Sequence, residues 1–153
     1  MFGAQLAASD SDVLVAVAGE EVSLSVAPRD MYGNVTVFSK SAAITATATG
    51  GGVSTSFEER TGTRTEVSLF STFRLAGSYL LTAKIGDKVL DGYPRILTVV
   101  SAATEPRKCM LFGDALQGVR CNRVSTLTVH AADKFGNLRS TGGDVVDVNL
   151  CSP

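Results

Sequence analysis

The side chain best suited to catalysis in this chain is its one histidine, His130, because imidazole exchanges protons near neutral pH. Acid–base or nucleophilic work needs a partner group within hydrogen-bond reach. The nearest carboxyl group in the sequence, Asp133, belongs to a turn motif, and His130 lies in an alternating segment on the face opposite Leu127 and Val129. No glycine-rich phosphate loop leads into a helical pattern. We therefore predict an exposed strand histidine, no cofactor and no enzymatic activity.

Three cysteines, Cys109, Cys121 and Cys151, all lie in the last third of the chain. Zinc sites use closely spaced cysteine pairs with further cysteines or histidines, and this sequence has no Cys-x2-Cys pair and one histidine. We predict no metal site. Two states of the thiols stay open: three free cysteines, or a Cys109–Cys121 disulfide if the protein is secreted.

The pattern Asp-x-aromatic-Gly-Asn occurs twice, with Asp30, Gly33 and Asn34 in the first copy and Asp133, Gly136 and Asn137 in the second. Carboxylate and amide oxygens suit calcium, but this ion takes about six to eight oxygen ligands and these loops hold too few acidic groups. Asp and Asn side chains accept hydrogen bonds from nearby backbone N–H groups, and glycine adopts positive φ without steric cost. Both copies are therefore predicted to be structural turns.

The charge of the chain is nearly balanced, with 14 basic and 15 acidic residues, and no basic run is longer than Arg107-Lys108. Nucleic-acid binding needs concentrated positive charge, so we predict no nucleic-acid partner. No apolar stretch approaches the roughly 20 residues that span a bilayer, and we expect no membrane insertion in this segment. No signal-peptide pattern opens the chain. Because the repeat described below begins near Met1, this leaves the compartment open.

Strands must position these residues, because the dominant period of the sequence is two. Residues 21–26 and 78–85 alternate polar with apolar side chains, as half-buried strands do. Glycine-rich and Asx-containing turns separate such runs. We predict no helix, but seven strands, near residues 13–17, 21–27, 42–48, 53–58, 65–72, 78–85 and 95–100, and another at 124–129. Seven short strands within about 100 residues are typical of an all-β, immunoglobulin-like sandwich.

An internal repeat divides the chain. Residues 124–137 align with residues 21–34 and share the pattern Leu-x-Val-x-x-x-Asp-x-aromatic-Gly-Asn. A period of about 100 residues fits tandem immunoglobulin-sized domains. A half-built sandwich exposes apolar faces, so we expect either that the protein continues beyond residue 153 or that the last strands dock on something else. We predict a complete repeat at residues 1–101, a linker at 102–108 and a partial second repeat at 109–153.

Three stretches carry a family resemblance. They are Val17-Ala18-Gly19 with the motifs of residues 24–34, Ala76-Gly77-Ser78-Tyr79 with Gly92-Tyr93-Pro94, and, after the Asp133 turn, Gly142-Gly143-Asp144. Together they resemble the filamin (actin-binding protein 280) repeat, in full over residues 2–100 and in part over 109–150. The resemblance implies an immunoglobulin-like β-sandwich in a multi-repeat, actin-associated scaffold. Tyr79 stands where such sandwiches have a tyrosine corner, with its hydroxyl bonded to nearby backbone.

The resemblance also implies how partners bind. Repeats stack on one another, or a partner's extended segment adds to a sheet edge by β-augmentation. In the family this groove lies between the third and fourth strands, so here it would be lined by Ile44, Ala46, Val53 and Thr55. Residues 43–48 carry no charge, and an uncharged edge requires a cover. The alternative is an ordinary strand that a neighbouring repeat covers.

A second class of function stays open, because filamin-like repeats also occur in gamete-surface proteins. Asn34-Val35-Thr36 is an N-glycosylation sequon. A cytoplasmic scaffold predicts free thiols and an unmodified Asn34, and an extracellular adhesion module predicts the reverse. A cytoplasmic, cytoskeletal location is the first expectation and the cell surface the alternative. In either case the expected partners are protein strands or neighbouring repeats.

Overall fold

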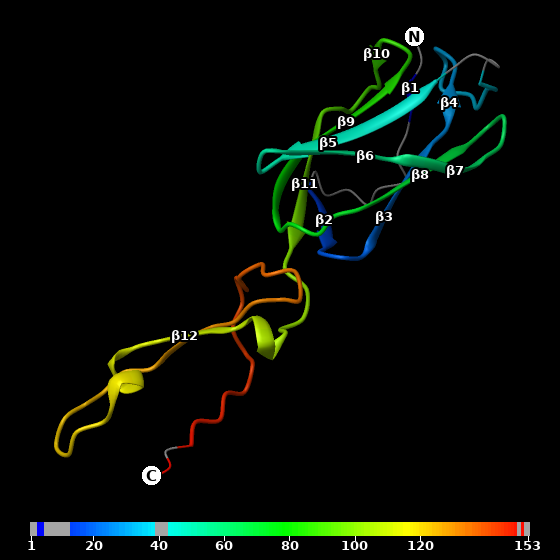
Figure 1. The fold of residues 1–153 in the computed structure, drawn as a ribbon. Coiled ribbons are helices and arrows are strands. Elements are labelled where there is room, and N and C mark those ends of the chain that lie inside the picture. Colours follow the sequence, from blue (N-terminus) through cyan, green and yellow to red (C-terminus); the bar gives the residue numbers. More distant parts are fainter. Residues whose placement is uncertain (1–2, 5–12, 39–42, 150, 152–153) are drawn as a thin grey trace. The chain divides into compact units, whose positions relative to one another are not determined.

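A computed structural model describes residues 3–4, 13–38, 43–149 and 151. The chain divides into two compact units, residues 1–100 (unit 1) and 101–153 (unit 2) (Figure 1). Strands form nearly all of the regular structure, and the helical segments among the described residues are short 3-10 turns in unit 2. The predicted all-β class is confirmed.

The larger sheet of unit 1 has five strands in a row. Their order is β2 (Val13–Val17), β11 (Arg95–Val100), β9 (Gly77–Ile85), β5 (Ile44–Gly50) and β6 (Val53–Ser56), and β10 (Lys88–Val89) also pairs with β9. Strands β2 and β11 run parallel, and the other pairs are antiparallel. The parallel pair joins the first long strand of the unit to its last, so residues far apart in the sequence complete the sheet.

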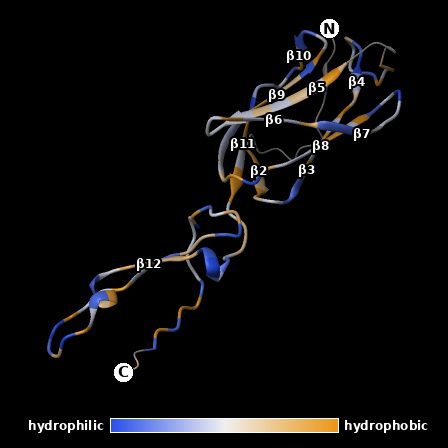
Figure 2. Cartoon of the chain, viewed as in Figure 1, coloured by the Kyte–Doolittle hydropathy of each residue, from blue (hydrophilic) through white to orange (hydrophobic). Residues whose placement is uncertain are grey.

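The smaller sheet of unit 1 has the order β3 (Glu21–Val26), β8 (Val67–Thr72) and β7 (Glu58–Gly62). A separate ribbon pairs β1 (Gly3–Ala4) with β4 (Pro28–Arg29). Alternate residues of the strands are buried, as the period of two predicts. The most buried apolar side chains come from both sheets, and each is at most 2 % exposed: Leu24, Val26, Leu69, Ala48, Leu81 and Leu97. Figure 2 shows the apolar character of β11, which supplies part of this core.

The strands predicted at 13–17 and 95–100 have those bounds in the structure, and most others shift by only one or two residues. The strand predicted at 53–58 is wrong as one element, because β6 belongs to the larger sheet and β7 to the smaller one. Phe57 lies between them, 8 % exposed, and its N–H donates to the Ala46 carbonyl at 2.9 Å. Burial of this aromatic side chain marks the point where the chain passes between the sheets.

The predicted tyrosine corner is confirmed. Tyr79 is 3 % exposed, and its hydroxyl donates to the Leu75 carbonyl oxygen at 2.8 Å. Its ring centroid lies 5.0 Å from that of Phe73. Burial raises the pKa of Tyr79, which keeps the hydroxyl protonated as a donor.

Unit 2 contains an antiparallel pair of short strands. They are β12 (Met110–Phe112) and β13 (Thr128–His130), with a 3-10 turn η1 (Pro106–Lys108) before them and another, η2 (Asp114–Gln117), between them. The strand predicted at 124–129 is wrong in its bounds, since only its last two residues belong to β13. The Thr126 N–H and hydroxyl both donate to the Asp114 carboxylate, so a side chain rather than a strand holds this part of the segment.

Candidate functional site

The four residues predicted to line a binding groove lie on β5 and β6, and their register places them on one face of the sheet, the face that points to the core at Ala46 and Ala48. Ile44 and Thr55 are half-buried, and Val53 is 45 % exposed. Ala46 is 2 % exposed and faces the core of unit 1, so its side chain is not available at a surface. This corrects the expectation for Ala46: its side chain is part of the core of unit 1 and does not line an open groove.

Strand β6 also changes where a partner could add. It pairs with the second half of β5, from Thr47 opposite Ser56 to Gly50 opposite Val53. A partner strand therefore cannot enter between β5 and β6 over these residues. The terminal strand on this side of the sheet is β6, and its residues 53–56 carry no charge. An added strand would pair with the outer edge of β6.

In the first Asp turn, the carboxylate of Asp30 accepts its hydrogen bonds from the turn itself. The Asp30 carboxylate accepts bonds from the N–H groups of Tyr32 and Asn34, each at 2.9 Å, and from the Asn34 side-chain amide at 3.0 Å. Gly33 has φ +87°, which a residue with a Cβ rarely adopts. The Asn34 side chain, followed by the backbone N–H groups, holds the pKa of Asp30 below its usual value.

The second Asp turn has the same local bonds and one more. The Asp133 carboxylate accepts from the Phe135 and Asn137 N–H groups at 2.9 Å and from the Asn137 amide at 2.8 Å. It also accepts from the Ala102 N–H at 2.9 Å. Asp133 is 0 % exposed. This burial raises its pKa, but the hydrogen bonds from Asn137, Ala102 and Phe135 outweigh the burial and leave the pKa below its usual value.

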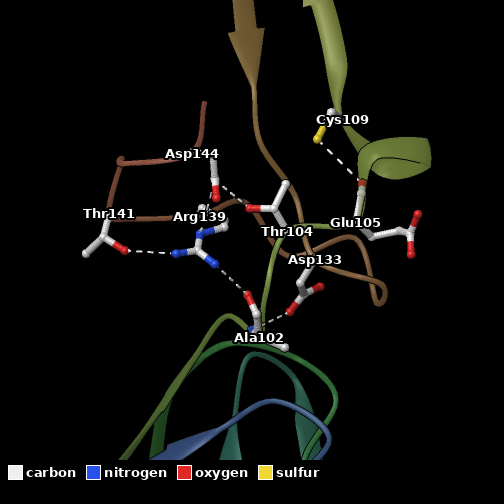
Figure 3. A network of polar contacts seen from close by, with 8 residues as sticks. All are labelled: Ala102, Thr104, Glu105, Cys109, Asp133, Arg139, Thr141 and Asp144. Atoms are coloured by element: carbon white, nitrogen blue, oxygen red, sulfur yellow. Dashed lines mark hydrogen bonds and ion pairs between the residues drawn. The ribbon is translucent and has the colours of Figure 1, made fainter. Parts of the chain in front are cut away.

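Asp133 is part of a polar network that holds the first residues of unit 2 (Figure 3). Arg139 Nη1 donates to the Ala102 carbonyl at 3.1 Å, and the Thr104 hydroxyl donates to the Asp144 carboxylate at 2.6 Å. Arg139 Nε lies 3.9 Å from the same carboxylate. Sequence motifs mark Asp133 and Asp144 but do not identify their partners, which lie 31 and 40 residues away in the chain.

Unit 2 also contains an apolar groove of about 510 Å³. It is lined by β12, η2, the segment leading into β13 and residues 146–149. The side chains that give it its apolar character include Leu111, Leu116, Leu127, Val129 and Val148. Leu111, Leu116 and Val148 are each more than half exposed. Sequence reasoning predicts exposed apolar faces in this unit, but the groove itself depends on segments that only folding brings together.

One wall of the groove is fixed by a close backbone approach. A Cβ at Gly113 would lie 2.1 Å from the Thr126 carbonyl oxygen, and Gly113 has φ +132°, so only glycine fits. The Ala115 N–H donates to the same oxygen at 3.2 Å. The backbone N–H of Thr126, followed by its hydroxyl, holds the pKa of Asp114 below its usual value. The segment leading into β13 is therefore held along one edge.

The histidine and the three cysteines do not line this groove. His130 is exposed at the end of β13, with its ring 4.9 Å from that of Phe112. Cys109 is half-buried and donates to the Glu105 carbonyl at 3.5 Å, and Cys121 and Cys151 are exposed; all three are unpaired in the structure. Among the described residues no group of His, Cys, Asp and Glu is placed to hold a metal ion. Within the same part of the chain, no helix is long and apolar enough to cross a bilayer.

Comparison with known proteins identifies the fold. No protein-family model matches the chain, and no curated protein matches it. The Lin-41 filamin domain is 18 % identical, with a TM-score of 0.51 over 63 % of this chain and 90 % of that one. The Escherichia coli adhesin FdeC is 18 % identical, with a TM-score of 0.58 over 91 % of this chain and 42 % of that one. At such identities the likeness is one of fold, and the chain is an all-β protein of the immunoglobulin-like sandwich class.

Proposed function

We propose that this chain is a non-catalytic module of tandem immunoglobulin-like repeats of the filamin type, which works by holding other proteins. The observation that carries the proposal is the turn built twice, since Asp30 and Asp133 accept the same three local hydrogen bonds. Their carboxylates and amides therefore serve the fold. The filamin domain and the adhesin that share the fold add support for this class. An actin-associated, cytoskeletal role rests on the filamin resemblance alone.

The proposed domain boundaries are a repeat at residues 1–101, a linker at 102–108 and a partial repeat at 109–153. The division of the chain into units between residues 100 and 101 supports the end of the first repeat. The start of the linker is held by unit 2, because Thr104 bridges to Asp133 and the Glu105 N–H donates to the Ala132 carbonyl at 2.8 Å.

The proposed binding mode is β-augmentation at the outer edge of β6. Of the four groove residues expected from the sequence, Val53 and Thr55 lie on this strand, and Ile44 lies on the part of β5 that β6 does not pair with. A partner strand would gain backbone hydrogen bonds along Val53–Ser56 and meet no charge on this strand.

A photo-crosslinking amino acid at Val53 tests this mode in the cells that make the protein. Val89 on β10 is the matched control, because the two side chains are 45 % and 47 % exposed. We expect discrete protein adducts from position 53 that are missing from position 89. Identical adducts from both positions, or none from either, would refute binding at the β6 edge.

The alternative function is an extracellular adhesion module, and exposure of Asn34 within its sequon favours it. Against it, the Asn34 side-chain amide donates to Asp30, and Asn137 uses its amide in the same way in the second turn without a sequon. Intact mass of the natural protein before and after deglycosylation and reduction decides between the two. A glycan on Asn34 or a disulfide would support adhesion, and a bare chain with three thiols would support the scaffold.

A further inference from the structure

The apolar groove of unit 2 is bordered by a strand edge that has no neighbour among residues 101–149. Strand β13 forms a sheet with β12 alone. In an antiparallel pair, alternate residues direct their N–H and C=O groups to the same neighbour. Both backbone groups of Thr126 bond to η2, its N–H to the Asp114 carboxylate and its C=O to the Ala115 N–H. By this alternation Thr128 and His130 face β12, and Leu127 and Val129 direct their backbone groups to the opposite edge. The side chains of Leu127 and Val129 line the groove beside that edge.

Unit 1 shows which strand pairs with the equivalent edge. The alignment of the two copies places Leu24 where unit 2 has Leu127, and Val26 where it has Val129. In unit 1 strand β8 pairs along this edge, with Leu69 opposite Leu24 and Val67 opposite Val26. All four unit 1 side chains are at most 6 % exposed. An antiparallel strand with apolar residues at alternate positions is therefore the neighbour that this strand edge fits.

The charge at the end of the edge differs between the two copies. Unit 1 has Glu20 and Glu21 at the start of β3, and the Arg60 guanidinium of β7 forms an ion pair with Glu21. Unit 2 has the exposed Arg123 at the position of Glu20 and a neutral valine at the position of Glu21. In unit 1 this charge comes from β7, one strand beyond β8, whose own residue opposite Glu21 is Thr72. An acidic residue near Arg123, on the strand that pairs with unit 2, would complement the charge of Arg123.

We infer that unit 2 is a strand acceptor whose occupant is an extended, antiparallel segment with alternating apolar residues and an acidic residue at its C-terminal end. The occupant pairs with Leu127 and Val129 and inserts two apolar side chains, placed two residues apart, into the groove. Its C-terminal end lies near Arg123, because β8 runs antiparallel to β3 and ends opposite Glu21. The site is separate from the β6 edge of unit 1, so either site can fail without the other.

A synthetic peptide with the sequence of residues 65–74 of this chain and the substitution Arg74→Asp is the probe. It carries the Val67 and Leu69 pattern of β8, followed by an acidic residue one position beyond the level of Arg123. The control peptides are the same sequence with Leu69→Asp, which removes one apolar anchor, and the sequence with its own Arg74. Binding to the whole 153-residue chain is measured by titration and by amide hydrogen exchange.

We expect the probe to bind at least about tenfold more tightly than the Leu69→Asp peptide, as the loss of one buried apolar anchor predicts. It should slow exchange at the Leu127 and Val129 amides. Equal affinity for the two peptides, or protection confined to unit 1, would overturn the inference. A concentration-dependent dimer that protects the same amides without peptide would show that a second copy is the occupant, and would also overturn it.

A charge reversal tests the direction of the occupant without touching the groove. In the variant Arg123→Glu the peptide with Arg74 should bind more tightly than the peptide with Arg74→Asp, the reverse of the order for the unchanged chain. Added salt should weaken both preferences. The variant Glu21→Arg reverses charge at the corresponding end of unit 1 and should leave the order unchanged. If the order of the two peptide affinities is the same in the unchanged chain and in Arg123→Glu, the acidic residue of the occupant is not placed near Arg123.

Discussion

The turns at Asp30 and Asp133 have the same sequence pattern and the same three local hydrogen bonds, yet they differ in their place in the fold. Asp30 is partly exposed and bonds within its own turn, whereas Asp133 is buried and also accepts from Ala102. The comparison teaches that the sequence of a turn specifies its local geometry, while its contribution to stability depends on what packs against it.

The same contrast extends to the strands that lead into the turns. Leu24 is buried in the core of unit 1 and pairs with Leu69 of β8, whereas Leu127, its counterpart, lines an open groove. Two copies of one sequence pattern therefore give a closed core in unit 1 and an accessible apolar surface in unit 2. Substitutions at matched positions of the two units measure this difference.

The largest effect is expected from shortening the two equivalent leucines. Leu24→Ala should lower the stability of unit 1 by about 3 kcal/mol, because it leaves a cavity in a packed core. Leu127→Ala should cost unit 2 less than half of that. The chain has no tryptophan and all three tyrosines lie in unit 1, so tyrosine fluorescence in urea reports on unit 1 and amide exchange on unit 2. Equal losses would break the comparison between the units.

The second largest effect is expected from substituting the aspartates of the two turns. Asp133→Ala should lower the stability of unit 2 by about 2 kcal/mol, because it leaves buried N–H groups, including that of Ala102, without an acceptor. Asp30→Ala should give a clearly smaller loss, because water can reach the N–H groups of its turn. Amide exchange of each unit is the measurement. A larger loss from Asp30→Ala would show that the bond to Ala102 adds nothing.

The tyrosine corner provides a smaller effect that is confined to unit 1. Tyr79→Phe should cost about 1 kcal/mol, because the Leu75 carbonyl loses its donor while the ring keeps its packing. Urea unfolding followed by circular dichroism reports the loss, with amide exchange in unit 2 as the internal control. An unchanged midpoint would mean that water replaces the hydroxyl without cost.

Acid should weaken unit 2 through Asp133, and this is the smallest effect. The pKa of Asp133 is lower in the folded protein than its ordinary value of 3.8, so the charged carboxylate stabilises the fold at higher pH. That stability is present above the unfolded pKa and is lost as the pH falls through the lower, folded pKa. NMR signal intensities of unit 2 between about pH 5 and 2 should show it. Asp133→Asn should make the decline shallower, and an unchanged profile would assign it to other carboxylates.

Much of the fold is readable in the sequence because strand period and turn chemistry are local. The alternation of residues 78–85 predicts β9 to within a residue. The position of Tyr79 in the sequence predicts that its hydroxyl bonds to nearby backbone, as it does to the Leu75 carbonyl. The passage of the chain between sheets at Phe57 is not readable, because residues 53–58 alone do not show which sheet each half joins. Ala46 is misplaced for a related reason, since a small uncharged residue suits a core and an exposed edge equally well.

The sequence by itself determined the all-β class, the internal repeat and the two Asp turns, because these depend on side-chain period and on bonds within a few residues. Only the tertiary structure decided that β6 pairs with β5, that Asp133 is buried against Ala102 and that Leu127 and Val129 border an open groove. Each of these depends on segments distant in sequence, whose pairing is set by the burial of apolar surface and the satisfaction of backbone hydrogen bonds across the whole unit.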